Sequence, residues 1–276
     1  MHYTFQANRY ELSYLKDPVE NQILWEHHCH ALYEMIAVLE GDVSVVLEGQ
    51  SYRLHPNQCM IIPPLCYHSV VVNQAGAYRR ITVFFDRSAI PSVLQEKFAR
   101  RETSHTMHVL PFPEEFSKIF QTEPSPYYTP LIESLMVRLF YRHAEAADAE
   151  NGDGGANRLM SQITSYIDRH LCDDLTLDTL VRHTALSKSS ICHIFKEKMG
   201  VPPGQYILQK RMAYAEKLLR EGHPATVVAT ELGYKNYATF YRAYHKHCGV
   251  NPQKTKPPKR FVQERAAPSS HDAAGS

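Results

Sequence analysis

The sequence lacks the patterns that mark secreted, membrane-spanning and zinc-bound proteins. Its six cysteines form no CxxC pair and have no regular spacing, which argues against a disulfide framework and a structural zinc module. No run of about eighteen apolar residues occurs, and the N-terminus has no signal-peptide core. We therefore expect a cytoplasmic protein with reduced thiols and no membrane partner. The cysteines are Cys29, Cys59, Cys66, Cys172, Cys192 and Cys248.

The near-neutral net charge of +1 hides two halves of opposite sign. Residues 1–157 hold 12 Lys and Arg against 19 Asp and Glu, whereas residues 158–260 hold 17 against 8. A basic half predicts a polyanionic partner. The polar, Gly-rich stretch 148–157 predicts a flexible linker, so we expect the two halves to fold independently. Residues 258–276 are poor in core residues and predict a disordered tail.

The first half begins with short apolar or alternating runs separated by turn residues, which predict an antiparallel β-barrel or sandwich over residues 1–87. Gly41-Asp42 and Gly49-Gln50 are the expected hairpin turns. The expected strands contain Tyr33–Leu39, Val43–Leu47, Met60–Ile62, Ser69–Val72 and Ile81–Phe85.

Helical spacing replaces this pattern in residues 88–147, a helical connector. Residues 130–147 carry a broad apolar stripe that must be buried. Two partners are open for it: a second copy of the chain, in a homodimer, or the barrel itself. The stripe consists of Leu131, Ile132, Leu135, Met136, Leu139 and Phe140.

One unit of the second half occurs twice, with an offset of 49 residues that relates Ile191, Phe195 and Gly200 to Phe240, Tyr244 and Gly249. Each copy reads as a short helix, a turn and a second helix, with Thr176, Ser187 and Asn236 as N-caps. A helix over 203–221, about 27 Å long, would join the copies and could hold them near the ~34 Å spacing of successive major grooves. Residues 158–257 therefore predict an all-α domain with two helix-turn-helix units.

The first two turns of a recognition helix reach base edges with the face opposite the buried stripe. Arg242 is suited to bidentate guanine reading, while the lysines suit phosphate contacts. The expected contacts of the first unit are Lys188, Ser189, Cys192, His193 and Lys196. Those of the second are Tyr237, Ala238, Thr239, Arg242 and Lys246.

The order of these residues resembles the DNA-binding domain of the AraC/XylS family of bacterial transcription regulators. The resemblance covers Leu175 to Lys256 and departs at a few positions, such as Ala185, where the family prefers Gly. It implies double-stranded operator or promoter DNA as a partner, with RNA polymerase as a further candidate. The matching residues are Ser187, Ile191, Phe195-Lys196, Gly200, Tyr206, Arg211, Ala215, Leu218-Leu219, Ala229, Leu232-Gly233-Tyr234, Phe240, Arg242, Gly249 and Pro252.

His28, His30 and Glu34 share parity, so one extended strand would point all three to one face, where His68 from a later strand could join them. The spacing His-x-His-x3-Glu-x6-Gly, followed by Pro63 and His68, resembles the cupin motifs, although Asn57-Gln58 replaces the Gly-Asp of the second motif. The resemblance implies a small antiparallel barrel, used as a sensor for a sugar or related metabolite.

Two functions are open for this site. In the favoured one, His28, His30, Glu34 and His68 line an effector pocket, with no catalytic residue and no cofactor. In the alternative, the same four residues bind a divalent metal in a cupin enzyme fused to a DNA-binding domain. The sequence thus predicts an α+β chain of two domains, a ligand-responsive transcription regulator with the metal enzyme as the rival interpretation.

Overall fold

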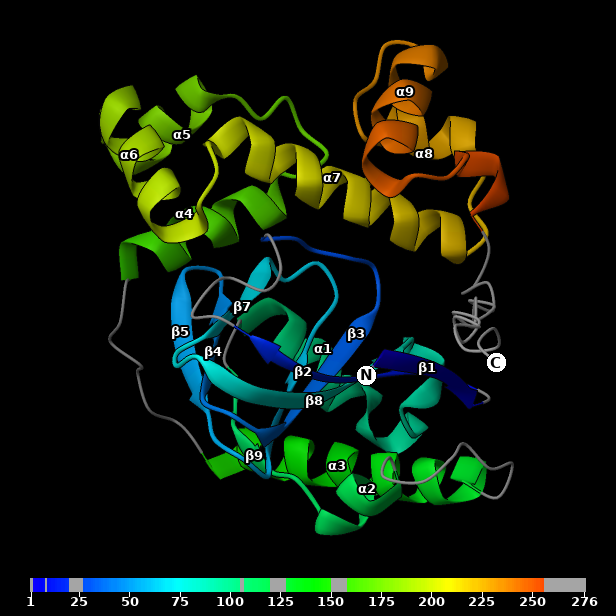
Figure 1. Cartoon of the computed structure of the whole chain (residues 1–276). Coiled ribbons are helices and arrows are strands. Elements are labelled where there is room, and N and C mark those ends of the chain that lie inside the picture. The colour runs from blue at the N-terminus through cyan, green and yellow to red at the C-terminus, as the bar shows by residue number, and fades with distance from the viewer. Residues whose placement is uncertain are drawn as a thin grey trace, which may run out of the picture.

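The computed structural model describes residues 2–7, 9–19, 27–104, 107–119, 128–149 and 158–255. It contains a β domain (residues 2–149) and a helical domain (residues 158–255) that lies across one end of it (Figure 1). Most of the expected linker, residues 150–157, falls outside the described residues, as do Trp25 and the expected tail. The predicted α+β architecture is confirmed.

Two antiparallel sheets form the β domain, and their order is β1-β2-β8-β3-β6-β9 in the large sheet and β5-β4-β7 in the small one. The large sheet contains β1 (His2–Ala7), β2 (Tyr10–Val19), β3 (Tyr33–Glu40), β6 (Gln58–Ile62), β8 (Gly76–Phe85) and β9 (Leu110–Pro111). The small sheet contains β4 (Val43–Leu47), β5 (Gln50–Leu54) and β7 (His68–Val72). The second hairpin turns at Glu48-Gly49, one residue earlier than expected, because these two residues adopt positive φ angles.

Strand β3 is buried on both faces because the large sheet is the middle of three layers. Ile36 and Val38 pack with the small sheet, whereas Met35 and Ala37 pack with helices on the other side. The helical layer is visible beneath the sheets in Figure 1. Its elements are the 3₁₀ turns Arg87–Ala89 and Ser92–Leu94 and the helices α1 (Gln95–Ser104), α2 (Glu114–Ile119) and α3 (Tyr128–Ala149).

The apolar stripe of α3 is buried on the chain's own sheet. Leu135 and Leu139 belong to the same core as Met35 and Ala37. Leu131 was wrongly placed in the stripe, since 40% of it is exposed. Because this helix completes the core and β9 extends the large sheet next to β6, the expected boundary at residue 87 does not separate two packed units.

The helical domain contains both predicted helix-turn-helix units, and its N-caps are confirmed: the side chains of Thr176, Ser187 and Asn236 accept hydrogen bonds from backbone N–H groups three residues on. Helix α4, which was not expected, packs Ile163 and Ile167 under the first unit. The elements are α4 (Arg158–Arg169), α5 (Leu177–Thr184), α6 (Lys188–Met199), α7 (Pro203–Arg220), α8 (Ala225–Glu231), α9 (Tyr237–Cys248) and the 3₁₀ turn Pro252–Lys254.

Helix α7 joins two cores in the helical domain. The first contains Ile191 and Phe195, and the second contains Phe240 and Tyr244. The first core also includes Cys29 and Tyr67 of the β domain. The expectation of two independent cores is therefore wrong at this contact, because apolar side chains at the end of the β domain complete the core of the first unit. None of the described helices is both long and apolar enough to cross a membrane.

Candidate DNA-binding surface and ligand centre

The recognition helices α6 and α9 lie toward opposite ends of α7 (Figure 1). Of the ten expected DNA contacts, Cys192 and Tyr237 are half-buried and the other eight are exposed. A DNA-reading face requires this exposure, because base edges and phosphates must reach the side chains.

On α6, the side chain of His193 is 81% exposed, and Lys188 Nζ lies 2.7 Å from a carboxylate oxygen of Asp178. The buried side of the same helix holds Ile191 and Phe195. The expected DNA contacts of α6 therefore lie on the side of the helix opposite its apolar stripe, as the sequence predicts.

On α9, the Thr239 hydroxyl donates to the Asn236 side chain at 2.9 Å, and Arg242 Nε lies 3.4 Å from the Ala238 carbonyl oxygen. The Tyr237 ring packs at the edge of the second core, and its hydroxyl is buried without a hydrogen-bond partner among the described residues. Tyr237 thus faces the protein more than the other residues of its predicted set, whereas Arg242 and Lys246 face solvent.

The four residues predicted for the β-domain site converge. One ligand atom from each of His28, His30, Glu34 and His68 can be chosen so that all lie within 4.8 Å of one another. They do not share one strand as predicted, since β3 begins only at Tyr33. His28 instead forms an isolated bridge with His68, which brings the two segments together. We call these four residues the ligand centre.

Hydrogen bonds at the ligand centre fix the ring orientations of two histidines. His30 Nδ1 lies 2.9 Å from the Leu32 carbonyl oxygen, and His68 Nδ1 lies 2.8 Å from that of Cys66. Both Nε2 atoms point at Glu34 Oε2, at 2.9 Å and 3.0 Å. Since a carbonyl only accepts, each Nδ1 must carry a proton.

A neutral ring with its proton on Nδ1 turns a lone pair toward Glu34, where two acceptors would meet. Either the rings are imidazolium ions or a cation lies between the acceptors. Metal-binding histidines commonly donate their second ring N–H to a backbone carbonyl, as His30 and His68 do. The donor set, imidazole nitrogens with one carboxylate, suits first-row divalent metals. The four residues therefore fit a metal ion.

Glu34 is buried, yet it is held as a carboxylate. Burial opposes its charge, but hydrogen bonds from His30 and His68 outweigh this effect and keep the pKa of Glu34 well below its usual range. Burial likewise opposes charge on His68, and Glu34 outweighs it, so the pKa of His68 is raised. The centre thus concentrates a charged acceptor in an apolar interior.

Three residues of β8 that the motif analysis missed lie on the same face of the large sheet as Glu34. Arg80, Thr82 and Phe84 alternate with residues of the helix-covered core. The Thr82 hydroxyl is buried without a hydrogen-bond partner among the described residues, and the Phe84 ring lies 5.3 Å from that of His30. The signal was available in the sequence, because Arg80 and Thr82 are polar at alternate positions of an otherwise apolar run.

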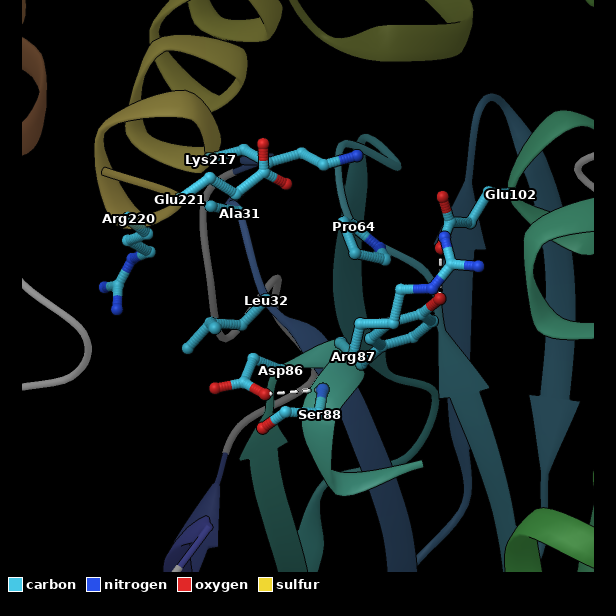
Figure 2. A pocket seen from close by; sticks show the side chains of 11 residues that line it. Ala31, Leu32, Pro64, Asp86, Arg87, Ser88, Glu102, Lys217, Arg220 and Glu221 are labelled. Atoms are coloured by element: carbon cyan, nitrogen blue, oxygen red, sulfur yellow. Dashed lines mark hydrogen bonds between the residues drawn. The ribbon is translucent and has the colours of Figure 1, made fainter. Parts of the chain in front are cut away.

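A cavity of about 310 Å³ lies between the β domain and the C-terminal end of α7, and no residue of the ligand centre lines it (Figure 2). Lys217 of α7 and Glu221, which directly follows this helix, lie across it from Leu32 and Pro64. A second cavity, of about 670 Å³, shares Pro64, Glu102 and Lys217 with the first. The two domains are thus separated by open space on this side.

Two family models match the chain: a cupin domain over residues 17–84 and a helix-turn-helix domain over residues 180–257. The chain is 25% identical to an uncharacterized HTH-type transcriptional regulator, YobQ of Bacillus subtilis, over 83% of this chain and 88% of that protein. It is 23% identical to the arabinose operon regulatory protein of Escherichia coli, over 80% and 78% of the two chains. The structure of ToxT from Vibrio cholerae aligns with a TM-score of 0.43 and 11% identity over 89% of this chain and 97% of that one.

The helix-turn-helix match covers both recognition helices, and the cupin match covers all four residues of the ligand centre. The relatives that span most of the chain are regulators of transcription. The chain is therefore a transcription regulator that resembles the AraC/XylS family, with a cupin domain before its helix-turn-helix domain.

Proposed function

We propose that a small molecule bound at the ligand centre controls how this regulator binds DNA, and that the chain is not an enzyme. The observation that carries the proposal is the position of the centre: a buried, charged, polar site within the domain that packs directly on the first helix-turn-helix unit. The names of the relatives, which describe regulators and no enzyme, support the second part.

We assign DNA contact to the exposed predicted residues of α6 and α9, with Arg242 reading a base and Lys188, Lys196 and Lys246 binding phosphates. Residues 158–260 carry nine more basic than acidic residues, so binding should release several counterions. The test is a salt titration of operator affinity, which should fall steeply as salt rises. An affinity that does not change with salt would refute the assignment.

The interior suits a hydroxylated ligand such as a sugar or a related metabolite. Glu34 can accept hydrogen bonds from ligand hydroxyls, and the unpartnered Thr82 hydroxyl can both donate and accept one. Phe84 provides an apolar ring beside His30. The test is a screen of sugars followed by operator binding with and without each ligand found. If no ligand changes operator affinity in the wild type, the effector model fails.

The ring orientations of His30 and His68 favour a second occupant, a divalent cation held by the four residues of the ligand centre. Such an ion would supply a Lewis-acidic position that holds an oxygen of the effector. Metal analysis of the purified protein tests it. A stoichiometric metal together with turnover of a substrate would favour the cupin enzyme instead of the sensor.

We further propose two protein partners and a cytoplasmic location. RNA polymerase is the partner through which a promoter-bound protein changes transcription. A second copy of the chain is supported by Leu131, Val137 and Tyr141, which remain exposed on α3. Sedimentation at micromolar concentration tests the dimer, and a purely monomeric protein would refute it.

A further inference from the structure

The two segments that carry the ligand centre present alternate residues to two different sides. His28 and His68 belong to the centre, whereas their neighbours Cys29 and Tyr67 are buried in the core of the first helix-turn-helix unit. The Tyr67 ring meets the Tyr206 ring of α7 edge to face, with centroids 5.0 Å apart. One side of each segment therefore forms the centre while the other side forms the contact between domains.

A buried carboxylate reinforces this contact. Glu48, at the tip of the hairpin between β4 and β5, accepts hydrogen bonds from the Tyr67 backbone N–H at 2.8 Å and from Lys210 Nζ at 3.0 Å. Its second oxygen accepts from the Tyr206 hydroxyl at 2.5 Å. Lys210 Nζ also lies 2.8 Å from Asp168 of α4. We call these residues the Glu48 clasp.

The clasp is charged although it is buried: Lys210 is 1% exposed. Burial opposes the charge on Lys210, but Asp168 and Glu48 outweigh this effect and raise its pKa. Burial and the neighbouring carboxylates also raise the pKa of Tyr206, which therefore keeps its proton and donates it to Glu48. Removing one partner of such a group leaves a buried charge without compensation, which favours separation of the domains into water.

The β domain also touches the end of the first recognition helix. A Cβ at Gly200, which ends α6 with φ +71°, would lie 3.2 Å from His27 Nδ1. A Cβ at Gly49, in the clasp hairpin, would lie 3.2 Å from Lys198 Cβ. In contrast, the described core of the second unit contains no residue of the β domain. The contact thus positions the first recognition helix and leaves its reading face exposed.

We propose that occupation of the ligand centre strengthens the Glu48 clasp and so fixes the first helix-turn-helix unit on the β domain. This inference rests on the proposed function, because it takes the ligand centre as the site of the regulatory ligand. His28 and His68 exchange backbone hydrogen bonds of 2.9 Å and 2.8 Å, and the Glu48 N–H donates to the Tyr67 carbonyl at 2.8 Å. A ligand that holds the two histidines therefore also holds Cys29, Tyr67 and the backbone of Glu48. Coupling between sites is reciprocal, so the clasp in turn strengthens binding at the centre.

Cys29 provides a probe of the contact in the full chain. It is buried between the domains, so an alkylating reagent reaches it slowly while the domains are docked. Cys59 is buried within the core of the β domain and reports unfolding instead. Reaction rates at both thiols are measured by peptide mass spectrometry for the wild type, Glu48→Gln and Lys210→Met. Glu40→Gln, which removes a half-buried ion pair with Arg79 away from the contact between domains, is the matched control.

We expect Glu48→Gln and Lys210→Met to raise the Cys29 rate by about tenfold without changing the Cys59 rate, and Glu40→Gln to change neither. Equal Cys29 rates in all proteins would overturn the clasp. If Lys210→Met also exposes Cys59, that variant has unfolded and Glu48→Gln decides alone.

The second arm uses Co²⁺ alone, whose visible absorption reports its coordination. Co²⁺ should slow the Cys29 reaction in the wild type but not in Glu48→Gln. Equal slowing in both proteins would mean that the bound ion shields Cys29 directly, and it would overturn the coupling. A wild type that is saturated with Co²⁺ and shows no slowing would overturn it too. A wild type that binds no Co²⁺ refutes the cation site of the proposed function, whereas the Cys29 rates without metal judge the clasp by themselves, so the two failures are distinguishable.

Discussion

Two exposed residues of helix α9 should contact different parts of the DNA: Arg242 a base and Lys246 a phosphate. Arg242 lies two residues from each of the buried Phe240 and Tyr244, about 200° around the helix from both, so its side chain leaves the opposite face. It is in the second turn after the N-cap Asn236 and can reach base edges. Lys246 lies one turn further, about 6 Å along the axis, where phosphates are the nearest partners.

We expect Arg242→Ala to lose about 1–3 kcal/mol on the preferred sequence and to relax the preference at one base pair. That loss is about 5- to 150-fold in affinity, because about 1.4 kcal/mol is tenfold. Lys246→Ala should weaken all sequences alike and lower the salt slope by about 0.9. Binding-site selection and salt titration of the two variants measure these effects. If both variants keep the preferred sequence and the affinity of the wild type, the proposed orientation of α9 is wrong.

Three other substitutions test the packing and the ligand centre. Leu135→Asp should lower the free energy of unfolding by at least about 3 kcal/mol, because Leu135 is buried on the chain's own sheet; a folded monomer made from a dimeric wild type would indicate a dimer contact instead. Ala185→Gly should stabilise the chain by about 0.5–1 kcal/mol in urea unfolding, because Ala185 has φ 57°, and an unchanged midpoint contradicts this. Glu34→Gln should weaken Co²⁺ binding at least about tenfold and leave operator binding without ligand unchanged, whereas unaltered Co²⁺ affinity would remove Glu34 from the centre.

The helical domain could be predicted from the sequence almost element by element because its signals are local. The caps at Thr176, Ser187 and Asn236 need only residues within the next turn, and each forms the expected bond. The repeat of 49 residues pairs Phe195 with Tyr244, and both are buried. Helix α4 was missed although Met160, Ile163 and Ile167 have helical spacing, because these residues follow directly on the Gly-rich stretch.

The four residues of the ligand centre were predicted to converge on the assumption of a backbone path that differs from the observed one. Parity grouped His28, His30 and Glu34 on the assumption of one continuous strand, but the segment before β3 reaches the centre through its bridge to His68. The four residues therefore converge although His28 and His30 lie outside β3. Thr82 was missed although it is polar at an alternate position of an apolar run, because this alternation does not show which strand lies beside β8. The pairing of β8 with β3, which brings Thr82 to the face of Glu34, joins distant segments of the chain.

The contact between the domains could not be predicted from the sequence, for a physical reason. Glu48 next to Gly49 is typical of a solvated turn, and Lys210 within α7 is typical of the basic residues on an exposed helix face. These charges are tolerable in the interior because they have partners there: Lys210 Nζ lies 3.0 Å from Glu48 and 2.8 Å from Asp168. Glu48 also adopts φ 47°, a conformation that disfavours residues with a Cβ, and the hydrogen bonds of the clasp offset that cost. No sequence pattern marks the strained turn at Glu48, its buried partner Lys210, or the ligand centre on the reverse side of the same segments as parts of one contact. The fold brings them together, and we propose that this contact carries the signal to DNA.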